Sequence, residues 1–256
     1  MRLLLLIFTL LAAVPAFADT PRVVVTLKPV HGLVAGVMAG LGAPHLLLSK
    51  GADPHNHALR PSEARALAKA GAVFWIGPAL EGYLQKPLVS LASGAQVVAL
   101  SQAPGVRLLP AREGGLWQDQ ADHGHEHGHD PHIWLDPRNA QAMVGRVVTV
   151  LSELDAANGA HYRRNGDQVI AALRSLELEI HQLLAPVRPL PYLAPPHAYQ
   201  HVAARLGPCL HPPPDSAADH TPAALGPLPT PHHPDPPPGA ARLGRPLLRA
   251  PPLPPP

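Results

Sequence analysis

At 256 residues, with a formal net charge of +2 and 15% charged side chains, the chain is long enough for one large domain or two smaller ones. This nearly balanced charge argues against nucleic acid or another polyanion as a partner. Two residue types are in excess, 17 His and 35 Pro. Because histidine is the commonest metal-binding side chain, the excess of His indicates metal chemistry.

The first 18 residues have the features of a secretory signal peptide. A basic residue at position 2 precedes an apolar run over 3–14, and an Ala-x-Ala cleavage site ends at Ala18. The apolar run is shorter than a bilayer span, so a membrane anchor is the weaker alternative. We therefore expect residues 1–18 to be removed on export. Cys209 is the only cysteine, so the exported domain must be stabilised by packing and not by a disulfide.

Residues 22–100 alternate between strand-like and helix-like patterns. Short β-branched or apolar runs predict buried strands at 22–27, 45–49, 72–77 and 96–100. Apolar residues at helical spacing predict helices at 31–42, 60–71 and roughly 79–91. Strands that alternate with such helices predict an α/β fold, in which a parallel sheet is covered on both faces.

A helical pattern resumes at Asp136, which we expect to cap a helix over 136–155 with Pro137 at its first position. A longer helix is predicted over 158–185, and "PYLA" at 191–194 predicts a strand that opens a second lobe. The expected organisation begins with a metal-binding α/β lobe over 19–135, which contains a His-rich loop at 119–131. A helical linker follows over 136–188, and a second α/β lobe starts over 189–207.

Residues 208–256 differ in composition from the rest of the chain. They hold 18 of the 35 Pro and lack Val, Ile, Phe, Tyr and Trp. Such a segment cannot form a ladder-bonded sheet or bury enough apolar surface to offset its ordering entropy. We interpret it as the product of a frameshift or a degenerate gene, because the two-lobe pattern stops where "PYLA" begins. The alternative is a disordered Pro-rich tail that truncates or replaces the second lobe.

A first candidate metal ligand, His55, lies in the loop "GADPHNHALRPSE" that leaves the second predicted strand. Ligands of open α/β sheets bind beyond the carboxyl ends of the strands. A neutral imidazole at that place can bind a borderline metal such as Zn²⁺. The alternative for His55 is an ordinary solvent-exposed loop histidine. His57 could be a second ligand, but we expect it to be exposed.

The segment "DHGHEHGHDPHIWLDP" (122–137) contains histidines of two kinds. His132 is followed directly by Ile133, Trp134 and Leu135, so we expect the core to resume there and to hold a preorganised ligand. The other four alternate with Gly and charged residues, with nothing apolar to pin the backbone: His123, His125, His127 and His129. We expect these auxiliary histidines to bind divalent ions weakly and hand them over, or else to form a solvated low-complexity insert. Asp136 is better explained as a helix cap than as a ligand.

Three stretches carry a family resemblance: "LKPVHGLVAGVMAGLG", "GADPHNHALRPSEARALAKAGAVFWIGPALEGYLQKPL" and "DPHIWLDPRNA". They resemble the periplasmic zinc-binding proteins of ABC-type high-affinity zinc uptake systems, within the zinc/manganese solute-binding family. The resemblance covers about residues 22–207, and an acidic His-rich loop before "HIWLDP" is typical of the zinc branch. It implies two α/β lobes joined by a long rigid helix, with metal bound in the cleft between them.

The same resemblance implies a ligand set. His55 and His132 correspond to the first two ligands, and the third comes from a motif similar to F-H-D-A-Y early in the second lobe. This chain reads "PYLAPPHAYQHVAARLG" there, which puts Pro196 at the ligand position and His197 at the Asp position. Either His197 substitutes with a one-residue shift, or the ligand is lost. The family's fourth ligand, a carboxylate or a water, has no counterpart that we can assign in this chain.

The leading hypothesis is a monomeric periplasmic protein that captures Zn²⁺ and delivers it to the membrane permease of an ABC transporter, impaired here by the abnormal C-terminal part. Ligands split between two lobes supply both affinity and release, so two His alone should bind orders of magnitude more weakly. The alternative is a His-rich metal buffer or chaperone with no transporter. We expect no enzyme activity, because the sequence contains no H-E-x-x-H or comparable motif.

Overall fold

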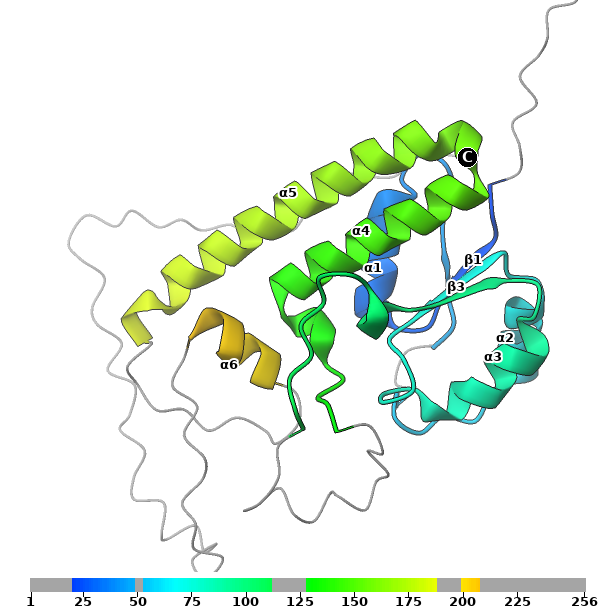
Figure 1. The fold of residues 1–256 in the computed structure, drawn as a ribbon, viewed down its shortest axis with the longest axis horizontal. Coiled ribbons are helices and arrows are strands. Elements are labelled where there is room, and N and C mark those ends of the chain that lie inside the picture. The colour runs from blue at the N-terminus through cyan, green and yellow to red at the C-terminus, as the bar shows by residue number, and fades with distance from the viewer. Residues whose placement is uncertain (1–19, 49–52, 112–127, 188–198, 208–256) are drawn as a thin grey trace, which may run out of the picture. The chain divides into compact units, whose positions relative to one another are not determined.

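The structure is a computed structural model that describes residues 20–48, 53–111, 128–187 and 199–207 (Figure 1). The strands are β1 (Val23–Val25), β2 (His45–Leu46), β3 (Ala72–Trp75) and β4 (Gln96–Ala99). The α-helices are α1 (Lys28–Val37), α2 (Pro61–Ala68), α3 (Gln85–Leu91), α4 (Pro137–Leu154), α5 (Gly159–Leu184) and α6 (Gln200–Leu206). Short 3₁₀ turns occupy Gly82–Leu84, Leu100–Gln102, Ile133–Leu135, Ala156–Asn158 and Ala185–Val187.

The four strands form one parallel sheet in the order β2-β1-β3-β4. In its register Val24 pairs with His45 on one side and with Val73 on the other. The α/β class, the parallel sheet and the long helix that the sequence predicts are confirmed. The first helix, predicted over 31–42, differs in its bounds: it begins three residues earlier, at Lys28, and ends at Val37. The turn that follows places Gly40 at a φ of 77°, a conformation that terminates a helix.

Alternate residues of the sheet supply two apolar layers. On one face Val25 and Phe74 pack with α1, α4 and the start of α5. On the other face Val24 and Val73 pack with α2 and α3, and these two helices lie side by side in Figure 1. Because neighbouring strand residues point to opposite faces, strands this short can be buried on both sides.

The helix α4 contributes its apolar side to the first of these layers. Val144, Val147 and Leu151 are all buried there, and the neighbouring helix α5 crosses close to α4 at Gly166. A Cβ built on Gly166 would overlap the Val148 side chain, so only glycine allows this approach. Residues 137–154 are thus packed into the core, while the division between a lobe and a linker at residue 135 stays a prediction.

The predicted start of α4 is confirmed. The Asp136 carboxylate accepts a hydrogen bond from the Arg138 N–H at 2.9 Å, and Pro137 occupies the first position of the helix. Within the described ranges no helix is long and apolar enough to cross a membrane. The predicted signal peptide, the strand at 191–194 and the tail at 208–256 lie outside the described residues.

A candidate metal centre at the carboxyl edge of the sheet

The structure brings together the two histidines that the sequence analysis singles out. The ring centroids of His55 and His132 are 5.5 Å apart, with an angle of 51° between the ring planes. His55 comes from the loop after β2, and His132 comes from the turn before α4. These residues are 77 positions apart in sequence, so the fold alone makes them neighbours.

His132 is held on several sides. Its Nδ1 lies 2.7 Å from Oδ1 of Asp130, and its backbone N–H donates to the same oxygen at 3.0 Å. The ring meets Trp134 edge to face at 5.3 Å, and the adjacent Ile133 is fully buried in the core. The expectation that the core resumes at this point is therefore confirmed. Among the described residues Nε2 of His132 has no hydrogen-bond partner, so it is the ring nitrogen left for a ligand.

Asp130 is itself buried, with 6% of its surface exposed. Burial disfavours its charged form, but the hydrogen bonds from the His132 side chain and backbone outweigh burial and lower the pKa of Asp130. Its second oxygen, Oδ2, is buried and has no hydrogen-bond partner among the described residues. A buried anion therefore lies directly behind the imidazole of His132.

His55 is more exposed than His132. Its side chain is exposed, and its backbone N–H donates to Oδ1 of Asp53 at 2.9 Å. This local turn shapes the loop, but it buries little of the imidazole. The structure thus combines one fixed and one exposed histidine in a single pair.

The expectation that His57 is exposed is wrong. Only 9% of its side chain is accessible, and its Nε2 lies 2.8 Å from Oε2 of Glu63 on α2. The ring also meets Tyr83 edge to face at 5.8 Å. His57 therefore anchors the loop to α2 and to the 3₁₀ turn Gly82–Leu84 that precedes α3.

Glu63 joins this anchor to the start of α2. The same Oε2 accepts the Arg60 backbone N–H at 2.8 Å, in the third helical position where carboxylates commonly stabilise a helix start. Burial raises the pKa of Glu63, but the hydrogen bonds from Arg60 and His57 more than compensate and lower it overall. The carboxylate is therefore charged when it holds His57.

A second buried carboxyl, Glu81, lies in the segment between β3 and α3. It is fully buried, and its Oε2 accepts the Ile76 N–H at 2.7 Å. Burial raises the pKa of Glu81 to about 7, against the effect of the backbone hydrogen bonds from Ile76 and Gly77. Near neutral pH this buried group is close to the point at which it changes charge.

The two ends of the segment 112–127 are joined beside His132. The Ala111 N–H donates to the Gly128 carbonyl at 2.8 Å, and Pro110 forms an antiparallel bridge with His129. His129 therefore has an ordered backbone, contrary to the expectation that nothing pins the loop there. His123, His125 and His127 lie outside the described residues, and so does His197.

Sequence reasoning missed the helix that supports this turn from the C-terminal side. His201 of α6 is buried, and its Nε2 donates to the Asp130 carbonyl at 3.1 Å. Arg205 makes two hydrogen bonds to the Asp136 carboxylate, at 2.8 and 2.9 Å. No local pattern in the sequence marks either contact, because the partners are about 70 positions apart.

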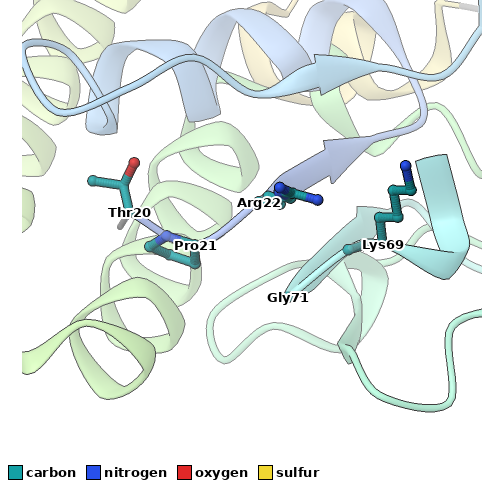
Figure 2. A pocket seen from close by; sticks show the side chains of 6 residues that line it. Thr20, Pro21, Arg22, Lys69 and Gly71 are labelled. Carbon is teal, nitrogen blue, oxygen red and sulfur yellow. The ribbon is translucent and has the colours of Figure 1, made fainter. Parts of the chain in front are cut away.

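Within the described part of the chain, no group of three or more His, Cys, Asp or Glu side chains could hold a metal ion. The described site is a pair of imidazoles. A separate hollow at the opposite edge of the sheet, shown in Figure 2, has no metal-ligating side chain among its lining residues. It is lined by Thr20, Pro21, Arg22, Lys69, Ala70 and Gly71.

The chain is similar in sequence to known proteins. The chain is 32% identical over 220 residues to the high-affinity zinc uptake system protein ZnuA of Brucella abortus, which covers 72% of this chain and 64% of that protein. It is 33% identical over 218 residues to the protein of the same name from Paracoccus denitrificans, covering 77% of this chain and 67% of that protein. The chain thus spans about 64% of the length of the Brucella proteins that it matches.

Solved structures show the same fold. A crystal structure of a ZnuA deletion mutant with zinc bound has a TM-score of 0.63 at 22% identity, over 73% of this chain and 67% of that chain. Zn(II)-bound AdcA from Streptococcus pneumoniae gives a TM-score of 0.61 at 21% identity, over 73% and 38% respectively. At this level of identity the likeness concerns the fold alone.

A family profile described as "Zinc-uptake complex component A periplasmic" matches residues 23–224. The description names a zinc-uptake component of the periplasm, which agrees with the predicted compartment. The match also extends into the Pro-rich segment that begins at residue 208. The chain therefore belongs to the ZnuA family of periplasmic zinc-uptake components.

Proposed function

We propose that this protein captures Zn²⁺ in the periplasm and delivers it to the membrane permease of an ABC transporter. The observation that carries the proposal is the His55–His132 pair at the carboxyl edge of a parallel sheet. Family membership supports the same function. Zinc is the cargo of such a protein, and it must be both held and released.

The geometry of the pair fits a shared zinc ion. With Zn–N distances of about 2.0–2.1 Å, two imidazoles on one tetrahedral ion have ring centroids roughly 5 Å apart. The centroids of His55 and His132 are 5.5 Å apart, so both could bind one ion with small side-chain adjustments. Nε2 of His132, which has no hydrogen-bond partner within the described ranges, is the nitrogen that would bind the ion.

His197 is our candidate for a third ligand. It precedes His201 by four positions, and His201 is hydrogen-bonded to the turn that carries His132. Four residues reach at most about 14 Å, so this contact restricts how far His197 can lie from the pair. A third nitrogen from the segment before α6 would make the site tighter than two imidazoles alone.

The auxiliary histidines are proposed to collect ions for this pair. The segment that contains His123, His125 and His127 begins and ends beside the turn of His132, because Ala111 is hydrogen-bonded to Gly128. Such a loop raises the local concentration of zinc without forming a rigid site. A metal buffer without a transporter remains the second candidate function, and the same loop is the feature that favours it.

Zinc titration of single variants tests the proposed site. We expect His55→Ala and His132→Ala each to lower zinc affinity at least about tenfold in competition with a chelator, since one ligand of a four-ligand zinc site contributes roughly 3 kcal/mol. His161→Ala is the matched control, because His161 lies against Gly40 at the other edge of the sheet. Equal affinity of all three variants and the natural chain would contradict the proposed site.

A loop replacement separates the carrier from the buffer. Because Ala111 and Gly128 are already paired, residues 112–127 can be replaced by a two-residue turn without moving the flanking backbone. For a carrier, we expect fewer zinc ions bound per chain but an unchanged tightest site that still requires His132. Loss of nearly all zinc binding would favour the buffer.

The proposed origin of residues 208–256 has its own test. We propose that the coding DNA from about residue 190 onward, read in another frame, encodes strands, a His-Asp-Ala-Tyr-like motif and a second lobe with a ligand carboxylate. Resequencing this DNA and translating all three frames decides the matter. If every frame lacks these features, the Pro-rich segment is a genuine part of the protein.

A further inference from the structure

We propose that Asp130 is the positioning residue of the zinc site: it holds the proton of His132 on Nδ1, so that Nε2 carries the lone pair that binds metal. This inference rests on the proposed function and assigns a role that goes beyond the ligands. It starts from the short contact of 2.7 Å between Nδ1 of His132 and Oδ1 of Asp130.

The contact has one consistent assignment of protons. Oδ1 of Asp130 already accepts the His132 backbone N–H, so it acts as an acceptor here, and Nδ1 of the imidazole is the donor in the short contact. Nε2 is then deprotonated, and it has no hydrogen-bond partner among the described residues. A neutral imidazole with this tautomer is ready to bind zinc without first moving a proton.

The surroundings of Asp130 make the arrangement rigid. Oδ1 also accepts the His132 backbone N–H at 3.0 Å, and the Asp130 carbonyl accepts from His201 at 3.1 Å. The Asp130 N–H donates to the Leu109 carbonyl at 2.9 Å, so the backbone on both sides of the carboxylate is fixed. The position and the protonation of the His132 ring therefore depend on one side chain.

The unsatisfied oxygen of Asp130 provides an independent argument. Oδ2 is buried and finds no hydrogen-bond partner in the described part of the chain, and a buried carboxylate that is incompletely paired is costly. A divalent cation on Nε2 of His132 would lie one imidazole away and offset that charge. Zinc binding would in turn make the Nδ1–H a stronger donor to Asp130, so ion and carboxylate stabilise each other.

The tautomer of His132 can be measured without any metal. We expect nitrogen NMR of the metal-free natural chain, at a pH where imidazoles are neutral, to show the Nδ1–H tautomer for His132. The signal is assigned by its loss in His132→Gln. In Asp130→Ala we expect a shift toward the Nε2–H tautomer and a loss of zinc affinity of about 10- to 100-fold. Asp130→Asn keeps an oxygen acceptor but loses the charge, so it should keep the tautomer and lose less affinity than Asp130→Ala.

Asp155→Asn is the matched control, because Asp155 is also 6% exposed and lies at the turn between α4 and α5. It should change neither the tautomer nor the affinity. An unchanged tautomer in Asp130→Ala, measured on a chain that still folds, would overturn the inference. A shifted tautomer in a protein whose natural chain binds no zinc would leave the assignment of Asp130 standing and overturn the proposed function.

Discussion

The two histidines of the candidate site are supported in opposite ways. His132 is 9% exposed, is hydrogen-bonded through its ring to a buried carboxylate, and lies on a turn that α6 contacts. His55 is exposed on a loop whose backbone turns on Asp53. The neighbouring residue His57 anchors this loop to Glu63 of α2.

This difference suggests that the two histidines would contribute differently to holding and to releasing a metal ion. A preorganised ligand contributes more to affinity, because no conformational freedom is lost when the metal binds. A ligand on an exposed loop adds less to the binding free energy, because ordering the loop costs conformational entropy. Such a ligand can, however, move away and release the ion. The zinc carrier that we propose needs both properties, and under that proposal the pair supplies one of each.

The largest expected effect is an unequal loss of zinc binding. We expect His132→Ala to lower zinc affinity about 100-fold and His55→Ala closer to 10-fold, because water can replace the exposed ligand more easily. Competition titration with a chelator measures both. Equal losses, or a greater loss for His55→Ala, would show that the comparison does not hold.

The next effect concerns Glu81, the buried carboxyl that accepts the Ile76 N–H. Because the pKa of Glu81 is raised to about 7 from 4.5, its neutral form favours folding, and this contribution is full below about pH 4.5 and lost as pH rises through 7. At roughly 1.4 kcal/mol per pH unit, the change is on the order of 3 kcal/mol. We expect Glu81→Gln to remove this component of the pH dependence in urea unfolding between pH 5 and 8. If the free energy of unfolding changed with pH in the same way in the natural chain and in Glu81→Gln, the predicted role of Glu81 would be wrong.

A smaller effect should follow from removing the support that α6 gives to the His132 turn. Arg205→Ala leaves the buried Asp136 without its two charged hydrogen bonds, and we expect a loss of about 1–2 kcal/mol in the free energy of unfolding. Arg138→Ala is the control, because that side chain is 63% exposed and its ion pair with Glu177 should contribute under about 0.5 kcal/mol. Urea unfolding of both variants measures the difference, and a larger loss for Arg138→Ala would contradict it.

The smallest effect is expected from the anchor of the exposed ligand. Glu63→Gln removes the charge that holds His57, and we expect zinc affinity to fall only about two- to fivefold, less than for a group bonded directly to a ligand. Glu153→Gln changes an exposed carboxylate on α4 and should have no effect on zinc affinity. A loss as great as that of Asp130→Ala would mean that His55 is as tightly held as His132.

The sequence alone determined most of the described architecture. All four strands lie at the positions where short apolar runs predict them, and the helices over 136–155 and 158–185 are present within a residue or two. The pairing of His55 with His132 was also predictable, from the resemblance and from the position of ligands beyond the carboxyl ends of parallel strands. These features follow from local periodicity and chain order, which a sequence records directly.

Only the tertiary structure decided how the two histidines are supported. It buries His57 against Glu63, places the Asp130 carboxylate on Nδ1 of His132, and brings Arg205 to the cap of α4. Hydrogen bonds of this kind depend on the direction of single side chains and on contacts between segments up to about 70 positions apart. No periodic pattern encodes them, because each requires the packed core to be in place before its partners meet.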